Sequence, residues 1–127
     1  METTIQGSPI LVLPKDNEVV GKLRRKLAEY RDRVAKYERD HPHQHPGFRA
    51  CVQASHICRI FILERLFADK TISAWPLSEE FFEVRQQEIP EFTTDEHWIE
   101  AWSIGWGVIE DYCTTGGQNV YGGTGLR

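Results

Sequence analysis

An amphipathic segment near the N-terminus constrains the fold more than any other feature of the sequence. Apolar side chains recur there with spacings of 3, 4, 3, 4 and 3 residues; they are Val20, Leu23, Leu27, Tyr30, Val34 and Tyr37. This spacing is typical of a helix whose one narrow face packs against a partner helix while the other faces stay in water. Asp16 or Asn17 can cap its start, because their side chains accept hydrogen bonds from free backbone N–H groups. The pattern predicts a helix over residues 17–39.

The partner helix is predicted directly after it. Two prolines and a glycine in residues 42–47 interrupt the helical pattern and make a short connection, so the next helix should fold back antiparallel. Residues 47–68 are apolar on most sides, which is typical of a helix with neighbours on more than one flank. We therefore expect an all-α fold centred on an antiparallel hairpin of 17–39 and 47–68.

Two further helices are predicted in the C-terminal half. Ser78 can cap a short acidic helix over about 78–88. Thr93 and Glu96 have the spacing of a capping box at the start of a helix over about 94–113. That helix carries a large apolar surface, which is either core or an aromatic docking surface. Its tryptophans, at helical spacing, are Trp98, Trp102 and Trp106.

The two ends of the chain do not have a helical pattern. Prolines bracket a short apolar run in residues 1–15, which suits an extended arm whose strand finds its partner on a neighbouring chain. Residues 114–127 are rich in glycine and are expected to be flexible or to become ordered on assembly. With 127 residues, the chain has the size of one domain, and we treat 1–127 as a single domain.

Charge is distributed unevenly along the chain. Residues 15–39 hold nine Lys or Arg against five Asp or Glu, whereas residues 79–111 hold ten acids and one base. The two halves can complement each other within the fold or between subunits, or the basic helix can meet an external polyanion. The overall charge of −4 argues against nucleic acid as that partner, because nucleic-acid-binding domains are usually basic.

Two surfaces are therefore candidates for binding a protein partner. One is the basic outer face of the 17–39 helix, and the other is the tryptophan-rich helix. The residues that we expect to contact a partner are Arg24, Arg25, Arg31, Trp98, Trp102 and Trp106.

Features that suggest catalysis or cofactor binding are few. Three histidines alternate with other residues in the turn after the first helix, at His41, His43 and His45. Imidazole is a common metal ligand, but alternation in an extended segment points neighbours in different directions, so a metal-dependent function there is only an alternative. The three cysteines fit no closed disulfide framework, and Cys51 and Cys58 lie too far apart along a helix to bond. We expect no cofactor and no enzymatic activity.

The sequence also bears on location. No apolar run approaches the length that spans a bilayer, and the N-terminus lacks the basic start and apolar stretch of a signal peptide. We therefore expect a soluble, cytoplasmic protein without a membrane partner.

One segment resembles a known family. Residues Ala50–Leu66, ACVQASHICRIFILERL, resemble the second helix of phage-encoded sponge proteins that sequester the cyclic nucleotides of bacterial immune signalling. The resemblance covers the predicted hairpin and ends at Lys70. It implies an oligomer that holds a small anionic ligand. Its phosphate contacts would be Lys22, Arg24, Arg25 and Lys26.

The sequence thus predicts a non-enzymatic helical interaction protein. It would act by forming a homo-oligomer or by binding a protein partner, as a structural or accessory component (of a phage, for example) or as a small inhibitor. A sponge for a small anionic ligand is the first alternative, and a metal-dependent function at the histidine turn is the second.

Overall fold

The first helix, α1, runs from Asn17 to Asp40 in the computed structural model, which describes residues 8–89 and 95–115. Asp16 caps it, because its carboxylate accepts a hydrogen bond of 2.9 Å from the N–H of Glu18. The predicted seam is confirmed over most of its length. Of the predicted seam, Leu23, Leu27 and Tyr30 are buried, and Val20, Val34 and Tyr37 are half-buried. At the start of the helix Val19, which was not predicted, is buried in place of Val20.

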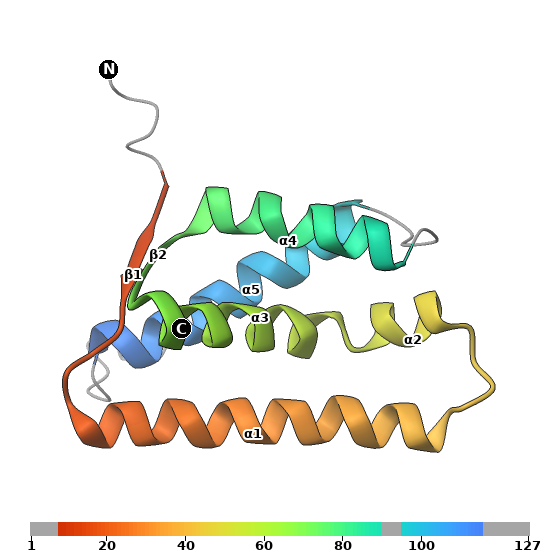
Figure 1. The fold of residues 1–127 in the computed structure, drawn as a ribbon, viewed down its shortest axis with the longest axis horizontal. Coiled ribbons are helices and arrows are strands. Elements are labelled where there is room, and N and C mark those ends of the chain that lie inside the picture. Colours follow the sequence, from red (N-terminus) through yellow and green to blue (C-terminus); the bar gives the residue numbers. More distant parts are fainter. Residues whose placement is uncertain (1–7, 90–94, 116–127) are drawn as a thin grey trace.

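The predicted second helix consists of two helices. Helix α2 spans Pro46–Val52 and α3 spans Ala54–Asp69, with the break at Gln53. The ring of His97, from the last helix, approaches the backbone here, with its Nε2 atom 3.1 Å from the carbonyl oxygen of Cys51. A side chain that inserts beside the helical ladder is a common cause of such breaks. Figure 1 shows α2 and α3 running back along α1, as the short connection predicts.

The apolar run of the N-terminal arm forms a strand, but its partner belongs to the same chain. Strand β1 (Ile10–Val12) pairs antiparallel with β2 (Thr71–Ser73), so the expectation of a partner strand on a neighbouring chain was wrong. The chain can reverse after α3 because Lys70 adopts a left-handed conformation, with φ of 70°. Leu11 and Ile72, opposite each other in the pair, both point into the core.

The acidic helix begins earlier than predicted. Helix α4 spans Ala74–Glu88, and Ser78 does not cap it. The Ser78 hydroxyl instead donates a hydrogen bond of 2.9 Å to the carbonyl oxygen of Trp75. Pro76 lies in the first turn, where its missing N–H has no partner to lose, so the proline does not delay the start of the helix.

The last helix, α5, spans Asp95–Thr115, close to the predicted 94–113. Its predicted cap Thr93 lies outside the described residues, as does the tail from 116 onward. Helix α3 packs against α1 on one flank and against α5 on another. The helices α3 and α5 approach closely at Gly105, where an added Cβ would lie 3.3 Å from Cγ of Arg59.

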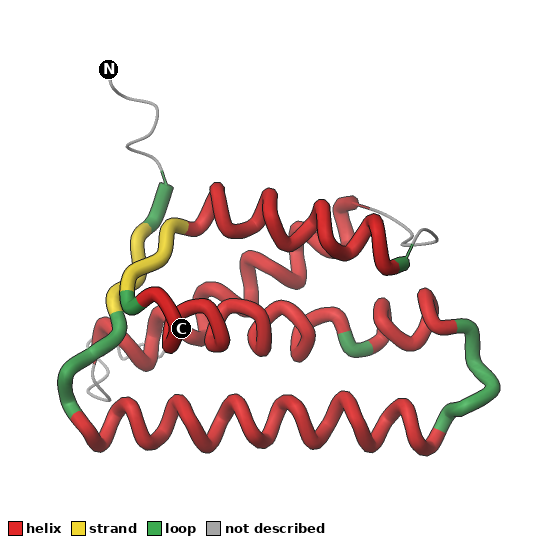
Figure 2. The backbone as a smooth tube through the Cα atoms, viewed as in Figure 1, coloured by secondary structure: helices red, strands yellow, loops and turns green. Residues whose placement is uncertain are grey.

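The described residues contain five helices and one two-stranded sheet, so the all-α fold class is confirmed. Figure 2 shows the small sheet at one end of the helical layers, where it joins the N-terminal arm to the start of α4. An aromatic cluster fills the space between α3, α4 and α5; its members are Phe61, Phe81, Phe82, Trp98 and Trp102. None of the helices within the described ranges is both long and apolar enough to cross a bilayer.

Candidate functional site

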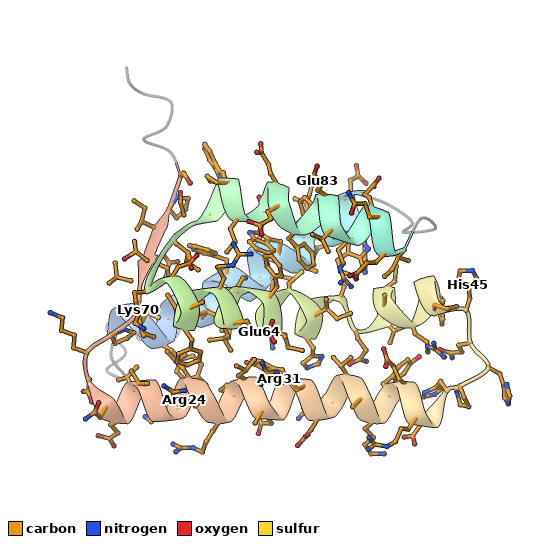
Figure 3. The ribbon with its side chains drawn as sticks, in the orientation of Figure 1. Arg24, Arg31, His45, Glu64, Lys70 and Glu83 are labelled. Atoms are coloured by element: carbon orange, nitrogen blue, oxygen red, sulfur yellow. The ribbon has the colours of Figure 1, made fainter. Side chains whose placement is uncertain are left out.

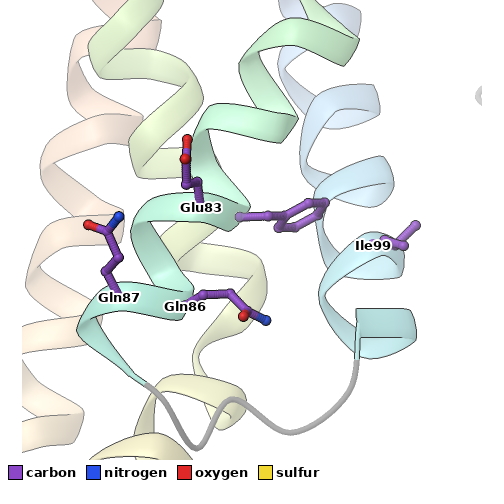
Figure 4. Close-up of a pocket in the computed structure, with 5 residues that line it drawn as sticks. Glu83, Gln86, Gln87 and Ile99 are labelled. Atoms are coloured by element: carbon purple, nitrogen blue, oxygen red, sulfur yellow. The ribbon is translucent and has the colours of Figure 1, made fainter.

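A groove lies between α4 and α5, and its lining is partly apolar. It has a volume of about 540 Å³ and is lined by Phe82, Glu83, Gln86, Gln87 and Ile99. In Figure 4, Gln86 extends toward α5. The groove combines an aromatic and an aliphatic side chain with one carboxylate and two amides.

Local sequence explains how the groove is built. Phe81 and Phe82 are consecutive on α4, so they point to different sides of the helix. Phe81 is buried against Trp98, with ring centroids 5.8 Å apart. Phe82 is only half-buried and reaches Trp102 from the rim, with centroids 6.3 Å apart. Phe81 therefore anchors α4 in the core, and Phe82 is left partly exposed in the wall of the groove.

Exposed acids occur on both helices that form the groove, and we define Glu79, Glu83, Glu96 and Glu100 as the acidic surface. Of these, Glu83 lines the groove. All four side chains are exposed, and none has a basic partner within ion-pair distance in the described part of the chain. Glu80 differs, because Arg65 binds it through two hydrogen bonds and lowers the pKa of its carboxyl group. A partly apolar groove with such a rim suits a side chain that has an aliphatic stem and a cationic end.

Two of the three arginines predicted to contact a partner point toward α3. The guanidinium of Arg24 lies 4.7 Å above the ring centroid of Phe67. Nη2 of Arg31 lies 2.6 Å from a carboxylate oxygen of Glu64, and Figure 3 shows both of these side chains between α1 and α3. Arg25 is exposed and projects elsewhere, because it follows Arg24 by about 100° around the helix.

Of the four residues predicted to hold an anionic ligand, Arg24 projects from a different side of α1 than the other three, and the anionic site stays a prediction. Lys22 and Lys26 lie one turn apart on one flank of α1, and Arg24 lies about 200° around the helix from each of them. Lys26 is moreover paired with Glu29 at 3.2 Å, which raises the pKa of the lysine.

The structure places the three predicted docking tryptophans in the core and not on the surface. Trp98, Trp102 and Trp106 have exposed fractions of 0%, 6% and 5%. Burial follows from the position of α5, whose apolar stripe faces α3 and α4 and leaves no indole for a partner to reach. The exposed tryptophan is Trp75, which is 51% exposed at the start of α4. Trp75 was not among the predicted binding residues, because it precedes the predicted start of the acidic helix at Ser78.

The histidine turn does not assemble a metal site. His41 stacks on Tyr37, with ring centroids 4.0 Å apart, and Nδ1 of His45 caps α2 by accepting a hydrogen bond from the N–H of Gly47. His43 points into solvent. In residues 8–89 and 95–115, no group of three or more His, Cys, Asp or Glu side chains could hold a metal ion.

The cysteines are free thiols in the structure. Burial raises the pKa of Cys58 to about 12 and that of Cys113 to about 11. Both therefore stay protonated at neutral pH, and a protonated thiol is a poor nucleophile.

Comparison with models of known families, with curated proteins and with solved structures gave no match to this chain. The resemblance to cyclic-nucleotide sponges stays a prediction drawn from Ala50–Leu66.

Proposed function

We propose that this protein is a non-enzymatic interaction protein that assembles with further copies of itself, head to tail. The observation that carries the proposal is a pair of oppositely charged surfaces on opposite sides of the molecule. In Figure 1, α1 and α4 lie on opposite sides of α3, and Figure 3 shows Glu83 on the side of α4 that faces away from α3. The basic surface of one copy would meet the acidic surface of the next.

The basic surface belongs to the N-terminal half of α1. Lys22 and Arg25 are exposed there, and neither has a carboxylate within ion-pair distance in the described residues. Arg25 is about 200° around the helix from both Leu23 and Leu27, so it points away from the buried seam. Its charge is therefore available to a second molecule.

The acidic surface offers this arginine a complementary site. The stem of an arginine can lie along Phe82 and Ile99 in the groove, while its guanidinium reaches the carboxylate of Glu83. Lys22 of the same copy would then meet another member of the acidic surface. The contact joins two different surfaces, so repeating it builds either a closed ring or an open filament.

Such an assembly should be sensitive to salt, because its charged groups are exposed. An exposed ion pair contributes about 0–1 kcal/mol and is screened within roughly 8 Å at physiological ionic strength. Sedimentation velocity should therefore find species heavier than the 14.7 kDa chain at low salt, and these should dissociate as salt is added. A monomer at every concentration and salt level would overturn the proposal.

Charge reversal provides the sharper test. The double variant Lys22→Glu/Arg25→Glu and the double variant Glu79→Lys/Glu83→Lys should each be monomeric. The first places acids on both surfaces, and the second places two lysines where the basic surface would dock. Mixing the two variants should restore the heavier species, since each then supplies one complementary surface. Failure of the mixture to associate would contradict the proposed contact.

A matched control separates this contact from a general effect of net charge. Glu38 is an exposed acid on α1, away from the acidic surface. Glu38→Lys and Glu83→Lys change the net charge equally, but only the second should weaken association. Equal weakening would show that net charge and not the groove controls assembly.

A further inference from the structure

A second cleft lies between α1 and the junction of α2 and α3. Its volume is about 260 Å³, and its lining residues are Arg33, Lys36, Tyr37, Asp40, Gln53 and His56. It is on a different part of the molecule from the groove between α4 and α5. The residues that line it were not among the candidates from the sequence, because they come from two helices that only the fold brings together.

Positive charge around this cleft exceeds negative charge. Lys36 and Asp40 neutralise each other, with Nζ and the carboxylate oxygen 2.8 Å apart. Arg33 has no such partner: in the described residues, no carboxylate lies within ion-pair distance of it or of Arg59. Arg59 is half-buried, and its Nε atom is shielded from solvent and forms no hydrogen bond within the described chain. A half-buried guanidinium without a counter-ion is energetically costly.

The environment of His56 reflects this excess. The centroid of the His56 ring lies 5.5 Å from that of Tyr30. The guanidinium of Arg59 lies 5.3 Å from the Tyr30 ring centroid. Burial, together with the charges of Arg59 and Arg33, lowers the pKa of His56 below its ordinary value. A lowered pKa favours the uncharged imidazole, which can both donate and accept a hydrogen bond.

We propose that this cleft binds a small phosphate-bearing ligand, with Arg33 as its main charge contact and His56 and Gln53 as hydrogen-bonding partners. A guanidinium binds two phosphate oxygens at once, and the amide and imidazole can donate to the others. Arg59 is three residues after His56 on α3 and would supply long-range attraction. The proposal is independent of self-assembly, because none of these residues belongs to either assembling surface.

The size of the cleft limits the ligand. Pockets for drug-sized molecules measure roughly 300–1,000 Å³, and this cleft is slightly smaller. A phosphate group with a small attached moiety fits such a volume, whereas a dinucleotide would extend far outside it.

Inorganic phosphate is the probe for the first test, titrated into the full chain at constant ionic strength with chloride as the balancing anion. Two-dimensional NMR should show saturable shifts of the Gln53 amide and the His56 ring. Arg33→Gln should weaken binding by about tenfold or more, the effect of losing a charge-assisted hydrogen bond. Lys15→Gln, which removes an exposed charge far from the cleft, should leave affinity unchanged. Linear shifts without saturation, or equal losses in both variants, would overturn the proposal.

The pH dependence gives an independent readout. Sulfate is the better probe here, since its charge is constant between about pH 5 and pH 8, the range in which a histidine ordinarily changes its charge. The groups that face or surround His56 are Tyr30, Arg33, Lys36, Tyr37 and Asp40 from α1 and Arg59 from its own helix. A bound anion favours the imidazolium, so sulfate should bind more tightly as pH falls, and His56→Gln should abolish this trend. A trend that persists in His56→Gln would contradict the assigned role.

The same phosphate chemistry can come from a free metabolite or from a lipid headgroup. Glycerol 3-phosphate should displace sulfate from the cleft, because a phosphate on a small moiety fits a volume of about 260 Å³. Vesicles that contain phosphatidic acid should not. Displacement by vesicles alone would overturn the assignment to a free ligand.

Discussion

Substitution of Leu11 tests how the N-terminal arm is attached to the domain. Leu11 is the central residue of β1, and only 1% of its surface is exposed. Its neighbours Ile10 and Val12 point to solvent and are 62% and 58% exposed. All three residues pair with β2 in the same short strand, so the main difference between them is the burial of their side chains. They therefore form a matched set for separating the two contributions.

The expected magnitude follows from burial. Replacing a fully buried leucine by alanine costs about 2–5 kcal/mol, which includes the cavity that is left behind. Leu11 lies in a short strand at one end of the helical layers, where the arm can partly relax, so we expect Leu11→Ala to lower the free energy of unfolding by about 3 kcal/mol. Ile10→Ala and Val12→Ala should each cost less than about 1 kcal/mol, because their side chains lose little contact.

Urea unfolding followed by circular dichroism measures these differences. It should be carried out at high salt, where the proposed assembly is dissociated, and at two protein concentrations. A midpoint that does not depend on concentration is expected for an arm that pairs within its own chain. Equal costs for all three variants, or a cost for Leu11→Ala below about 1 kcal/mol, would refute the reasoning.

Three further predictions use the same structure. Trp98→Ala should lower the free energy of unfolding by about 3–5 kcal/mol in urea titrations, because the indole of Trp98 is fully buried. Trp75→Ala should change it little, and similar costs for the two variants would contradict this prediction. The Cys58 thiol, whose pKa burial raises to about 12, should resist iodoacetamide at about pH 8 until the protein unfolds, as mass spectrometry would reveal; rapid labelling of the native protein would contradict this. His56 has a lowered pKa in the folded state, so the unfolded state takes up the proton first and stability should fall as pH drops below about 6.5. His56→Gln should flatten that fall between about pH 7 and pH 5, whereas His43→Gln, at an exposed position, should not.

The candidate site could be predicted only in part. The basic character of the first helix and the acidic character of residues 79–111 are visible in the sequence, and these regions carry the two proposed assembling surfaces. The sequence did not show which of these charged side chains would point to solvent and which toward another helix. Arg24 and Arg31 lie on the flank of α1 that faces α3, where Phe67 and Glu64 engage them, and a single helix pattern does not reveal what its flanks will meet. Both clefts likewise depend on which helices become neighbours.

Local information was enough to determine the first helix. The spacing of Leu23, Leu27 and Tyr30 and the cap at Asp16 predict α1 with its bounds, because helix periodicity and capping involve residues within one or two turns of each other. Tertiary structure alone decided the pairing of β1 with β2, the break at Gln53 and the burial of the three tryptophans of α5. Each of these depends on a contact between segments far apart in the chain. The partner of a strand edge, of a helix carbonyl or of an apolar indole is whichever group the fold brings next to it. The periodicity of one segment does not identify that neighbour.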